Sequence, residues 1–346
     1  MVTALLAAEL WIAGGTLVSA QGERQVAVQV SAGRIARLAD EAPAGANLLD
    51  AKGLWLAPAV IDAHVHLSVA GELPAVAQAE LRAGIAAVLD LGEPERLLPR
   101  LAGLAPLHVL FAGPLLTAPL GYPTQSWGKD GYGLPLSTPA EARAAVGRLQ
   151  KAGARMIKLA FDDRYPVLSP EVAKAAVDAA HALGLNAAAH ALGIKLVRRA
   201  LDAGCDVLAH TPVEPLPEDL VTEIGARRLW VVSTLKAFGG SATAVENLRH
   251  LRAAGARVVY GTDLGNAGTA PGVDAGELAL LSAAGLSAPE ILQAATAAPA
   301  ELLGLGGLGA LAEGREASLL ALKRDPRIDP TALSDAAWVL IGGVRQ

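Results

Sequence analysis

Cysteine and positive charge are both scarce in this chain. A single cysteine, Cys205, cannot form an internal disulfide, and so low a cysteine content is typical of proteins of the reducing cytoplasm. The formal net charge is −5, and no basic stripe or arginine-rich segment is present, which argues against nucleic acid as a partner. We therefore expect a cytoplasmic protein whose partner is a small molecule.

No segment suits a membrane-spanning helix, although hydrophobic residues make up 52% of the chain. The longest stretch without Asp, Glu, Lys or Arg, residues 101–128, is interrupted by four prolines. Residues 1–20 are apolar, but they lack a basic lead and include Glu9, so we expect no secretory signal and no membrane contact. The excess of alanine and leucine instead indicates helices packed on a buried sheet, with enough apolar surface to permit a homo-oligomer.

Two kinds of apolar periodicity divide the chain. Residues 2–57 alternate in short segments around Gly-centred turns, and the tail from 306 to 346 returns to this antiparallel pattern at 318–322 and 338–341. Between them, short apolar segments alternate with alanine-rich helical stretches that end at glycines. The predicted strands are 59–66, 86–91, 107–112, 155–160, 186–190, 206–210, 229–233 and 257–263, and the predicted helices include 139–152, 170–183, 243–254, 274–284 and 289–303.

Eight strands that alternate with helices are typical of a parallel (β/α)8 barrel. We predict an α/β fold in which residues 58–303 form a TIM-type catalytic barrel. Residues 1–57 and 304–346 are expected to combine into a small β-sandwich domain. No low-complexity linker or internal repeat interrupts this pattern.

Polar side chains that can bind metal recur where the predicted strands end. His64 and His66 close the first strand, and alternation places them on the same face, roughly 6–7 Å apart along the backbone. Lys158 lies in the fourth strand, while His190, His210 and Asp263 close the fifth, sixth and eighth. Because the carboxyl ends of barrel strands meet at one mouth, we expect these six side chains to converge there.

These motifs resemble those of the amidohydrolase superfamily over nearly the whole chain. The matching segments are Asp-Ala-His-Val-His at 62–66, Lys158, 189–191, 208–212, Gly-Thr-Asp at 261–263 and the tail segment 314–320. Ser318 stands where the family usually has Asp, a departure outside the site. Within the superfamily, the sequence is most similar to the branch of imidazolonepropionase and the metal-dependent prolidases and carboxypeptidases.

The resemblance implies a centre with two divalent metal ions. His64, His66 and Asp263 would bind the more buried ion, and His190 and His210 the more exposed one. Lys158, carboxylated by carbon dioxide to a carbamate, would bridge the two, and burial favours the neutral lysine that this reaction needs. Zinc is the ion expected of nitrogen and oxygen ligands without thiolate, although manganese and cobalt stay open.

The resemblance further implies a hydrolase that acts on C–N bonds. A hydroxide shared by the two ions would attack an amide, cyclic amide or dipeptide, and Asp263 would pass the proton to the leaving group. Three alternatives stay open: a lactonase or phosphotriesterase at the same centre, a deaminase with one ion, and a non-catalytic assembly protein on the same scaffold. Lys158 argues against the deaminase, and the complete set of six positions argues against the assembly protein.

Each of these residues also has a structural interpretation. Lys158 could lie at the surface or pair with a carboxylate beside a single ion, and Asp263 could only cap the following loop. Substrate contacts are less defined. The candidates are Tyr122 and Trp127, in the Pro-, Gly- and aromatic-rich segment after the third strand, and Asp162 and Thr234, which follow strands four and seven. These four could line the pocket, or they could pack loops or face solvent.

Overall fold

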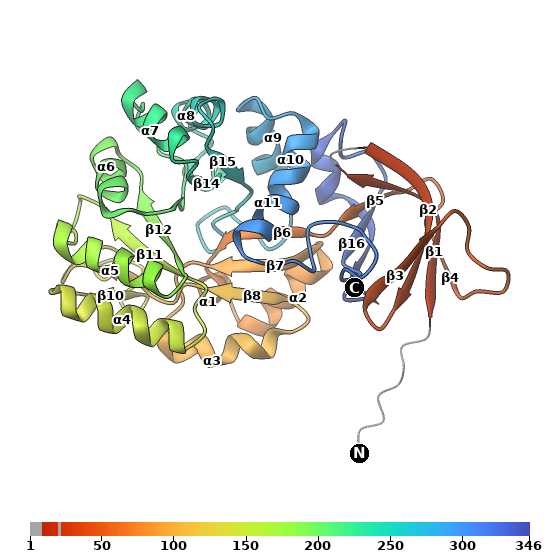
Figure 1. The fold of residues 1–346 in the computed structure, drawn as a ribbon, viewed down its shortest axis with the longest axis horizontal. Coiled ribbons are helices and arrows are strands. Elements are labelled where there is room, and N and C mark those ends of the chain that lie inside the picture. The colour runs from red at the N-terminus through yellow and green to blue at the C-terminus, as the bar shows by residue number, and fades with distance from the viewer. Residues whose placement is uncertain (1–8, 20–21) are drawn as a thin grey trace, which may run out of the picture.

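The structure, a computed structural model, describes residues 9–19 and 22–346. Of the N-terminal segment considered for a secretory signal, residues 1–8 and 20 lie outside the described residues. Within the described part of the chain, no helix combines the length and apolarity that crossing a membrane requires. The two ends of the chain meet in one sheet, and the middle of the chain forms a larger body of helices and parallel strands (Figure 1).

The terminal sheet contains eight strands in the order β18-β17-β16-β5-β1-β2-β3, with β4 paired to β1. Residues such as Ile12, Val28 and Leu319 point into a shared apolar core. The tail therefore pairs with the N-terminal strands, with Leu320 opposite Ala57. The β-sandwich is not confirmed, because the strands are hydrogen-bonded as one sheet. The strands are β1 (Leu10–Ser19), β2 (Gly22–Ser31), β3 (Arg34–Ala39), β4 (Leu48–Asp50), β5 (Trp55–Pro58), β16 (Leu319–Leu322), β17 (Ala336–Ile341) and β18 (Val344–Arg345).

The middle of the chain contains two parallel sheets, one of three strands (β6-β7-β8) and one of seven (β10-β9-β11-β12-β13-β14-β15). Each predicted strand of this region overlaps a strand of these sheets, which confirms the α/β class. The strands are β6 (Val60–Val65), β7 (Ile85–Asp90), β8 (His108–Phe111), β9 (Leu115–Thr117), β10 (Gly133–Pro135), β11 (Met156–Phe161), β12 (Asn186–Ala191), β13 (Val207–Leu208), β14 (Trp230–Val232) and β15 (Arg257–Val259).

Individual backbone hydrogen bonds join these two sheets at both of their seams. On one side, the N–H of Arg155 donates to the carbonyl of Phe111 (3.0 Å). On the other, the N–H of Ala63 donates to the carbonyl of Tyr260 (3.0 Å), and that of Asp263 donates to the carbonyl of His64 (2.8 Å). The predicted closed barrel is therefore not detected as one continuous ladder of eight strands. The strand arrangement is of the TIM type, with isolated contacts at the seams.

The eighth strand is shorter than predicted. It was expected at 257–263, but β15 ends at Val259. The N–H of Tyr260 donates to the carbonyl of Ala294 in a flanking helix instead of to a neighbouring strand (2.8 Å). Asp263 then takes a φ of +54°, a left-handed conformation that a strand does not contain. Residues 260–263 therefore fall outside the regular strand, although the N–H groups of Ala63 and Thr234 still donate to the carbonyls of Tyr260 and Gly261.

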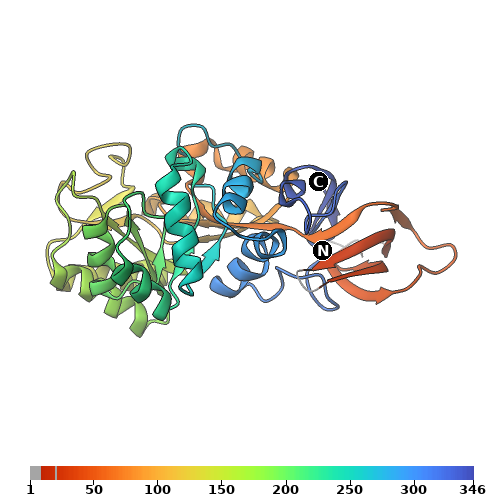
Figure 2. The same ribbon diagram turned by 90° about the horizontal axis from the view of Figure 1, so that it is seen from above.

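Helices flank the parallel strands (Figures 1 and 2). Local signals explain several boundaries; for example, Thr138 and Glu141 form a capping box ahead of α4, and Pro139 occupies its first turn. The predicted helix 289–303 is divided at Thr296, and Pro299 has no N–H to donate to Ala295. The helices are α1 (Leu67–Ala70), α2 (Leu73–Arg82), α3 (Leu98–Leu101), α4 (Pro139–Lys151), α5 (Pro170–Ala182), α6 (Ile194–Ala203), α7 (Glu218–Ala226), α8 (Ala242–Ala253), α9 (Ala275–Ala283), α10 (Ala288–Ala295) and α11 (Ala297–Leu302).

Candidate metal centre

The six residues predicted to bind metal come from five different strands or strand ends. His64 lies in β6, Lys158 in β11 and His190 in β12, while His66 follows β6 directly and His210 and Asp263 follow β13 and β15. All six side chains belong to buried residues, none more than 6% exposed. Burying this many titratable groups is costly unless they satisfy one another or bind an ion.

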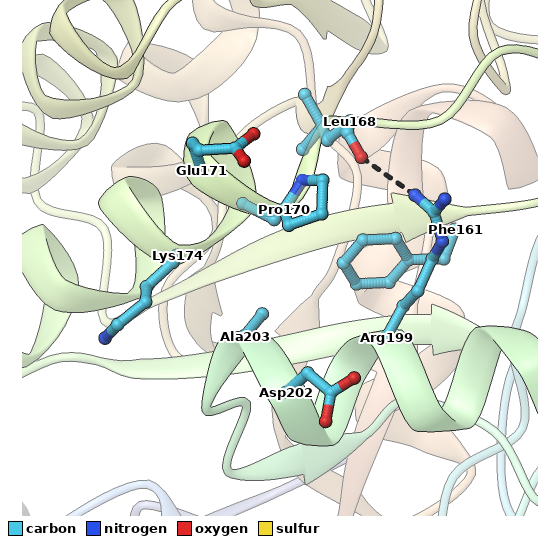
Figure 3. A pocket seen from close by; sticks show the side chains of 9 residues that line it. Phe161, Leu168, Pro170, Glu171, Lys174, Arg199, Asp202 and Ala203 are labelled. Carbon is cyan, nitrogen blue, oxygen red and sulfur yellow. Dashed lines mark hydrogen bonds between the residues drawn. The ribbon is translucent and has the colours of Figure 1, made fainter.

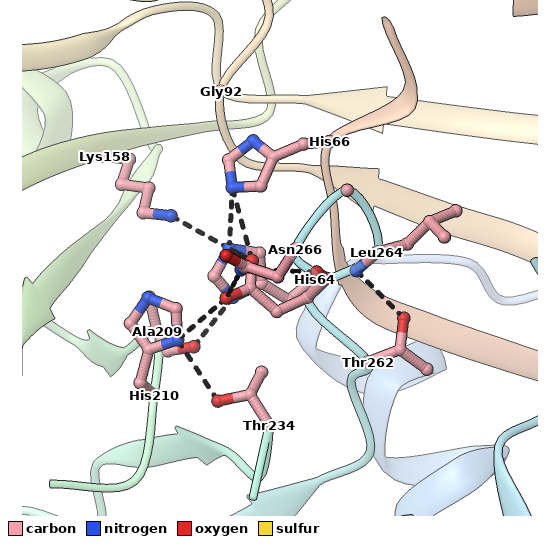
Figure 4. A network of polar contacts seen from close by, with 12 residues as sticks. His64, His66, Gly92, Lys158, Ala209, His210, Thr234, Thr262, Leu264 and Asn266 are labelled. Atoms are coloured by element: carbon pink, nitrogen blue, oxygen red, sulfur yellow. Dashed lines mark hydrogen bonds and ion pairs between the residues drawn. The ribbon is translucent and has the colours of Figure 1, made fainter. Parts of the chain in front are cut away.

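Three of them form a compact group at the end of β6. The Nε2 atoms of His64 and His66 lie 3.3 Å apart. Asp263 Oδ1 lies 3.3 Å from the first and 3.4 Å from the second. Ligand atoms of these three residues all lie within 4.8 Å of one another, a spacing at which they could hold one metal ion. Figure 4 shows His64 and His66 together, with Lys158 and His210 beside them.

Lys158 and His210 extend this group, and His190 stands next to His210. The Nζ of Lys158 lies 2.9 Å from His64 Nε2. His210 Nδ1 lies 3.7 Å from Asp263 Oδ2, and the rings of His190 and His210 have their centroids 4.8 Å apart. The structure thus brings the six predicted residues to one place.

Hydrogen bonds set the direction of two imidazoles. His64 Nδ1 lies 2.8 Å from the carbonyl oxygen of Ala209, so Nδ1 carries the proton and Nε2 keeps its lone pair. That lone pair faces His66 and Asp263. The ring of His210 is held by a 3.1 Å contact between its Nδ1 and Thr234 Oγ1. Both imidazoles therefore have defined orientations before any ion binds.

Burial controls the charge of the site. It lowers the pKa of Lys158 to about 8, against the opposing effect of the carboxylates of Asp263 and Asp90. Burial and the nearby Lys158 lower the pKa of His190 to about 3, and burial also lowers the pKa of His64 and His210 well below the usual value. Neutral imidazoles are the form that binds metal.

Asp263 behaves in the opposite way. Burial alone would raise its pKa, but the neighbouring imidazoles of His64, His210 and His66 hold that pKa well below the ordinary value. Its Oδ1 is buried and has no hydrogen-bond partner. An ionised oxygen placed between two imidazole nitrogens without a donor is what a bound cation would satisfy. These residues therefore fit a divalent ion.

Several residues that the sequence analysis gave no role hold the site in place. Asp62 accepts hydrogen bonds from the backbone N–H of His64 and from both the N–H and the hydroxyl of Thr262, which ties β6 to the residues after β15. Asp90 accepts from the N–H of Gly92. A Cβ on Gly92 would lie 2.4 Å from the ring of His66, so only glycine leaves room for that imidazole.

The mouth of the site is a cavity of about 380 Å³. Tyr122 and Trp127 line it, as predicted for substrate contacts. Asp162 instead lines a neighbouring cavity and binds Arg164 through both carboxylate oxygens. Thr234 is fully buried behind His210 and is absent from the lining. Three further residues line this cavity, namely Tyr165, Phe238 and Asn266. They lie in segments without a periodic sequence pattern, so the sequence does not point to them.

Comparison with known families decides the classification. Residues 55–343 match the amidohydrolase family. The chain belongs to this family. The superfamily predicted from the motifs is thereby confirmed, and the solved structures of related folds include prolidase-like amidohydrolases.

Several known proteins are similar to this chain over most of its length. An uncharacterized protein of Mycobacterium tuberculosis is 30% identical, with 89% of each chain covered. A Xaa-Pro dipeptidase with bound methionine has a TM-score of 0.84 at 20% identity, covering 98% of this chain and 100% of its own. A candidate prolidase from Bifidobacterium longum has a TM-score of 0.82 at 28% identity, covering 99% of this chain and 95% of its own.

Proposed function

We propose that this amidohydrolase is a metal-dependent hydrolase that cleaves a C–N bond in an amide, cyclic amide or dipeptide. Family membership and hydrolase neighbours such as the Xaa-Pro dipeptidase and molinate hydrolase support a C–N hydrolase. The observation that carries the proposal is the buried group of His64, His66 and Asp263, in which an ionised oxygen lacks a hydrogen-bond donor.

His64, His66 and Asp263 would hold one divalent ion, and His190 and His210 a second. Bound there, divalent ions of this kind supply Lewis acidity, polarising a substrate carbonyl and lowering the pKa of water. Zinc is the ion that we propose, since the donors are nitrogen and oxygen without thiolate. Residues 58–303 would form the catalytic domain, and residues 1–57 with 304–346 the small domain.

Lys158 is the residue that could join the two halves of the centre. Its neutral amine can add to carbon dioxide, forming an N–C bond and releasing one proton, and the product is a carbamate whose single negative charge is shared by two oxygen donors. Burial supports this reaction because it lowers the pKa of the amine to about 8, so that a larger fraction is neutral than for an exposed lysine.

Asp263 is placed to move the proton. It is the only carboxylate among the described residues that line the cavity, and it is ionised because its pKa is held low. Asn266 Nδ2 donates a hydrogen bond to Oδ2, which fixes the carboxylate at the cavity wall. We propose that Asp263 takes a proton from the attacking water and delivers it to the leaving nitrogen.

The direct test combines metal analysis with a substrate screen. The purified protein would be reconstituted with zinc, manganese or cobalt, and its bound metal counted per chain. About two ions per chain with hydrolysis of N-acyl amino acids, dipeptides or cyclic amides is the expected result. One ion per chain together with deamination, or metal binding without any hydrolysis, would contradict the proposal.

A further inference from the structure

Aromatic rings are rare in this chain but gather at the cavity beside the candidate metal centre. Only 3% of the residues are Phe, Trp or Tyr. Four of them line this one cavity, namely Tyr122, Trp127, Tyr165 and Phe238. They come from three separate loops, after β9, β11 and β14, so their meeting is a property of the fold and not of one local sequence.

Three of these rings each contact a different histidine of the site. The ring of Trp127 lies edge-on to His66, with centroids 5.2 Å apart. Tyr122 stacks on His190 at 4.7 Å and 26°, and Phe238 meets His210 edge-on at 4.9 Å. A substrate group that reaches these histidines is therefore bounded by several aromatic rings.

The loop that carries two of the rings is held by specific contacts. Trp127 Nε1 donates to the hydroxyl of Tyr122 (2.8 Å), and Trp127 also packs on Tyr132, whose hydroxyl lies 2.8 Å from Ser68 Oγ. A Cβ on Gly128 would lie 2.4 Å from the ring of Pro123, so the loop closes tightly on itself. Rings fixed in advance bind a planar group with little loss of side-chain entropy.

A second cavity adjoins the one that these rings line. This second cavity, of about 600 Å³, shares Arg164, His190, Leu192 and Phe238 with the first. Its further lining includes the charged residues Asp163, Lys195 and Glu214. A substrate that crosses from one cavity to the other would stay beside His190 and Phe238 and would reach these charged side chains.

A third cavity offers a useful contrast. It lies between α5 and α6, where Arg199 donates a hydrogen bond to the carbonyl of Leu168 (Figure 3). One aromatic ring, Phe161, contributes to its described lining, and none of the six predicted metal ligands does. This third cavity thus offers apolar surface without several aromatic rings. The first cavity combines four aromatic rings with the proposed metal ligands.

We infer that the substrate carries a planar aromatic group, held among Tyr122, Trp127 and Phe238, and a charged group on the other side of its C–N bond. This inference rests on the proposed hydrolase function. It deepens that function by naming the substrate class, an amide that joins an aromatic group to a charged one.

The test compares matched amides that differ by a phenyl ring. N-benzoylglycine would be compared with N-acetylglycine, and N-acetylphenylalanine with N-acetylalanine, so that the ring lies on either side of the bond. In the metal-reconstituted protein, kcat/KM should be about tenfold or more higher for the phenyl-bearing member of at least one pair. Trp127→Leu and Phe238→Leu should each reduce that ratio several-fold, whereas Trp55→Leu, in the terminal sheet, should leave the ratio unchanged.

Binding of the same four amides, followed by isothermal titration, separates the two proposals. A preference for the phenyl-bearing amides in binding without turnover would contradict the hydrolase and leave the aromatic site standing. Equal binding and equal turnover of both members of each pair would overturn the aromatic inference while the hydrolase stands. A preference that survives both the Trp127 and the Phe238 replacements would also overturn it.

Discussion

The Nζ of Lys158 lies 2.9 Å from His64 Nε2, although the two residues are 94 positions apart. Because His64 donates its Nδ1 proton to Ala209, Nε2 can only accept, and the lysine must be the donor. An ion at His64 would need the same lone pair. The lysine nitrogen must therefore give up this contact when metal binds, and conversion to a carbamate would do so while removing its positive charge.

Carbon dioxide uptake should depend on pH in a defined direction. An ammonium cannot react with carbon dioxide, and the pKa of Lys158 is about 8. Metal-free protein should therefore form more carbamate as the pH rises through about 8. Isotopically labelled bicarbonate and carbon NMR would measure the product. Lys151→Ala, which removes an exposed lysine of α4, should keep the signal.

Removing Lys158 should abolish turnover, and added carboxylic acids should partly restore it. Lys158→Ala leaves a buried space where the bridging anion would lie, so the carbamate signal and the activity should both disappear. Short carboxylic acids such as acetate should partly restore kcat, because a free carboxylate can occupy that space. Full activity of Lys158→Ala without any added acid would contradict the bridging role.

The carboxylate of Asp263 should matter more for turnover than for metal content. Asp263→Asn keeps the shape and one oxygen donor but removes the ionised base, so kcat should fall by about 10²–10⁴-fold while metal stays bound. Steady-state kinetics together with elemental analysis would measure both quantities. Asp178→Asn, at an exposed ion pair with Lys174, is the matched control. Undiminished turnover in Asp263→Asn would refute the proton-transfer role.

Gly92→Ala should weaken the centre without replacing a candidate ligand. The added methyl would lie 2.4 Å from the imidazole of His66 and must displace it. We expect metal affinity to fall about 10–100-fold, as for other changes that misalign a ligand. Gly147→Ala is the control, since a Cβ there meets nothing within 4 Å and should stabilise α4 by up to about 1 kcal/mol. Equal metal affinities in the two variants would show that the imidazole can move aside freely.

One ion pair between β8 and the tail should make stability depend on pH. His108 Nε2 lies 2.8 Å from Glu316 Oε2; the contact raises the pKa of His108, and it outweighs burial to lower that of Glu316. The histidine's contribution is complete below its unfolded pKa and is lost as the pH rises through its folded pKa. The glutamate's contribution is complete above its unfolded pKa and is lost as the pH falls through its folded pKa.

The ion pair therefore contributes its full stability between the ordinary pKa values of glutamate and histidine, 4.5 and 6.5. Because the His108 side chain is 41% exposed, solvent screening limits the pair to roughly 1 kcal/mol or less. A double-mutant cycle of His108→Ala and Glu316→Ala, with urea unfolding at about pH 5.5 and about pH 8.5, measures the coupling. A coupling that is equal at both pH values would contradict the assignment.

The sequence located the candidate centre because strand periodicity and strand ends carry the information. Alternation predicted that His64 and His66 share a face, and strand-end placement predicted that His190, His210 and Asp263 would join them. The structure places these side chains close together. The metal and catalytic roles of these residues remain proposals. The family could be predicted from the sequence because its motifs coincide with these strand ends.

What the sequence did not predict depends on contacts between distant elements. The early end of β15 follows from a hydrogen bond between Tyr260 and Ala294, which no local pattern encodes. Phe238 reaches the cavity from a short 3-10 turn, and Asn266 from an irregular loop. Gly92 matters only through its distance to the ring of His66.

The link between the two sheets has a consequence for biosynthesis. β5 belongs to the terminal sheet and pairs with β16, and after one intervening residue the chain enters β6, which carries His64. The N–H of that intervening residue, Ala59, donates to the carbonyl of Ser318. A nascent chain from which β16 has not yet emerged from the ribosome therefore lacks the partner of β5 and Ala59. If His64 binds metal as proposed, binding should follow the synthesis of β16 and not precede it.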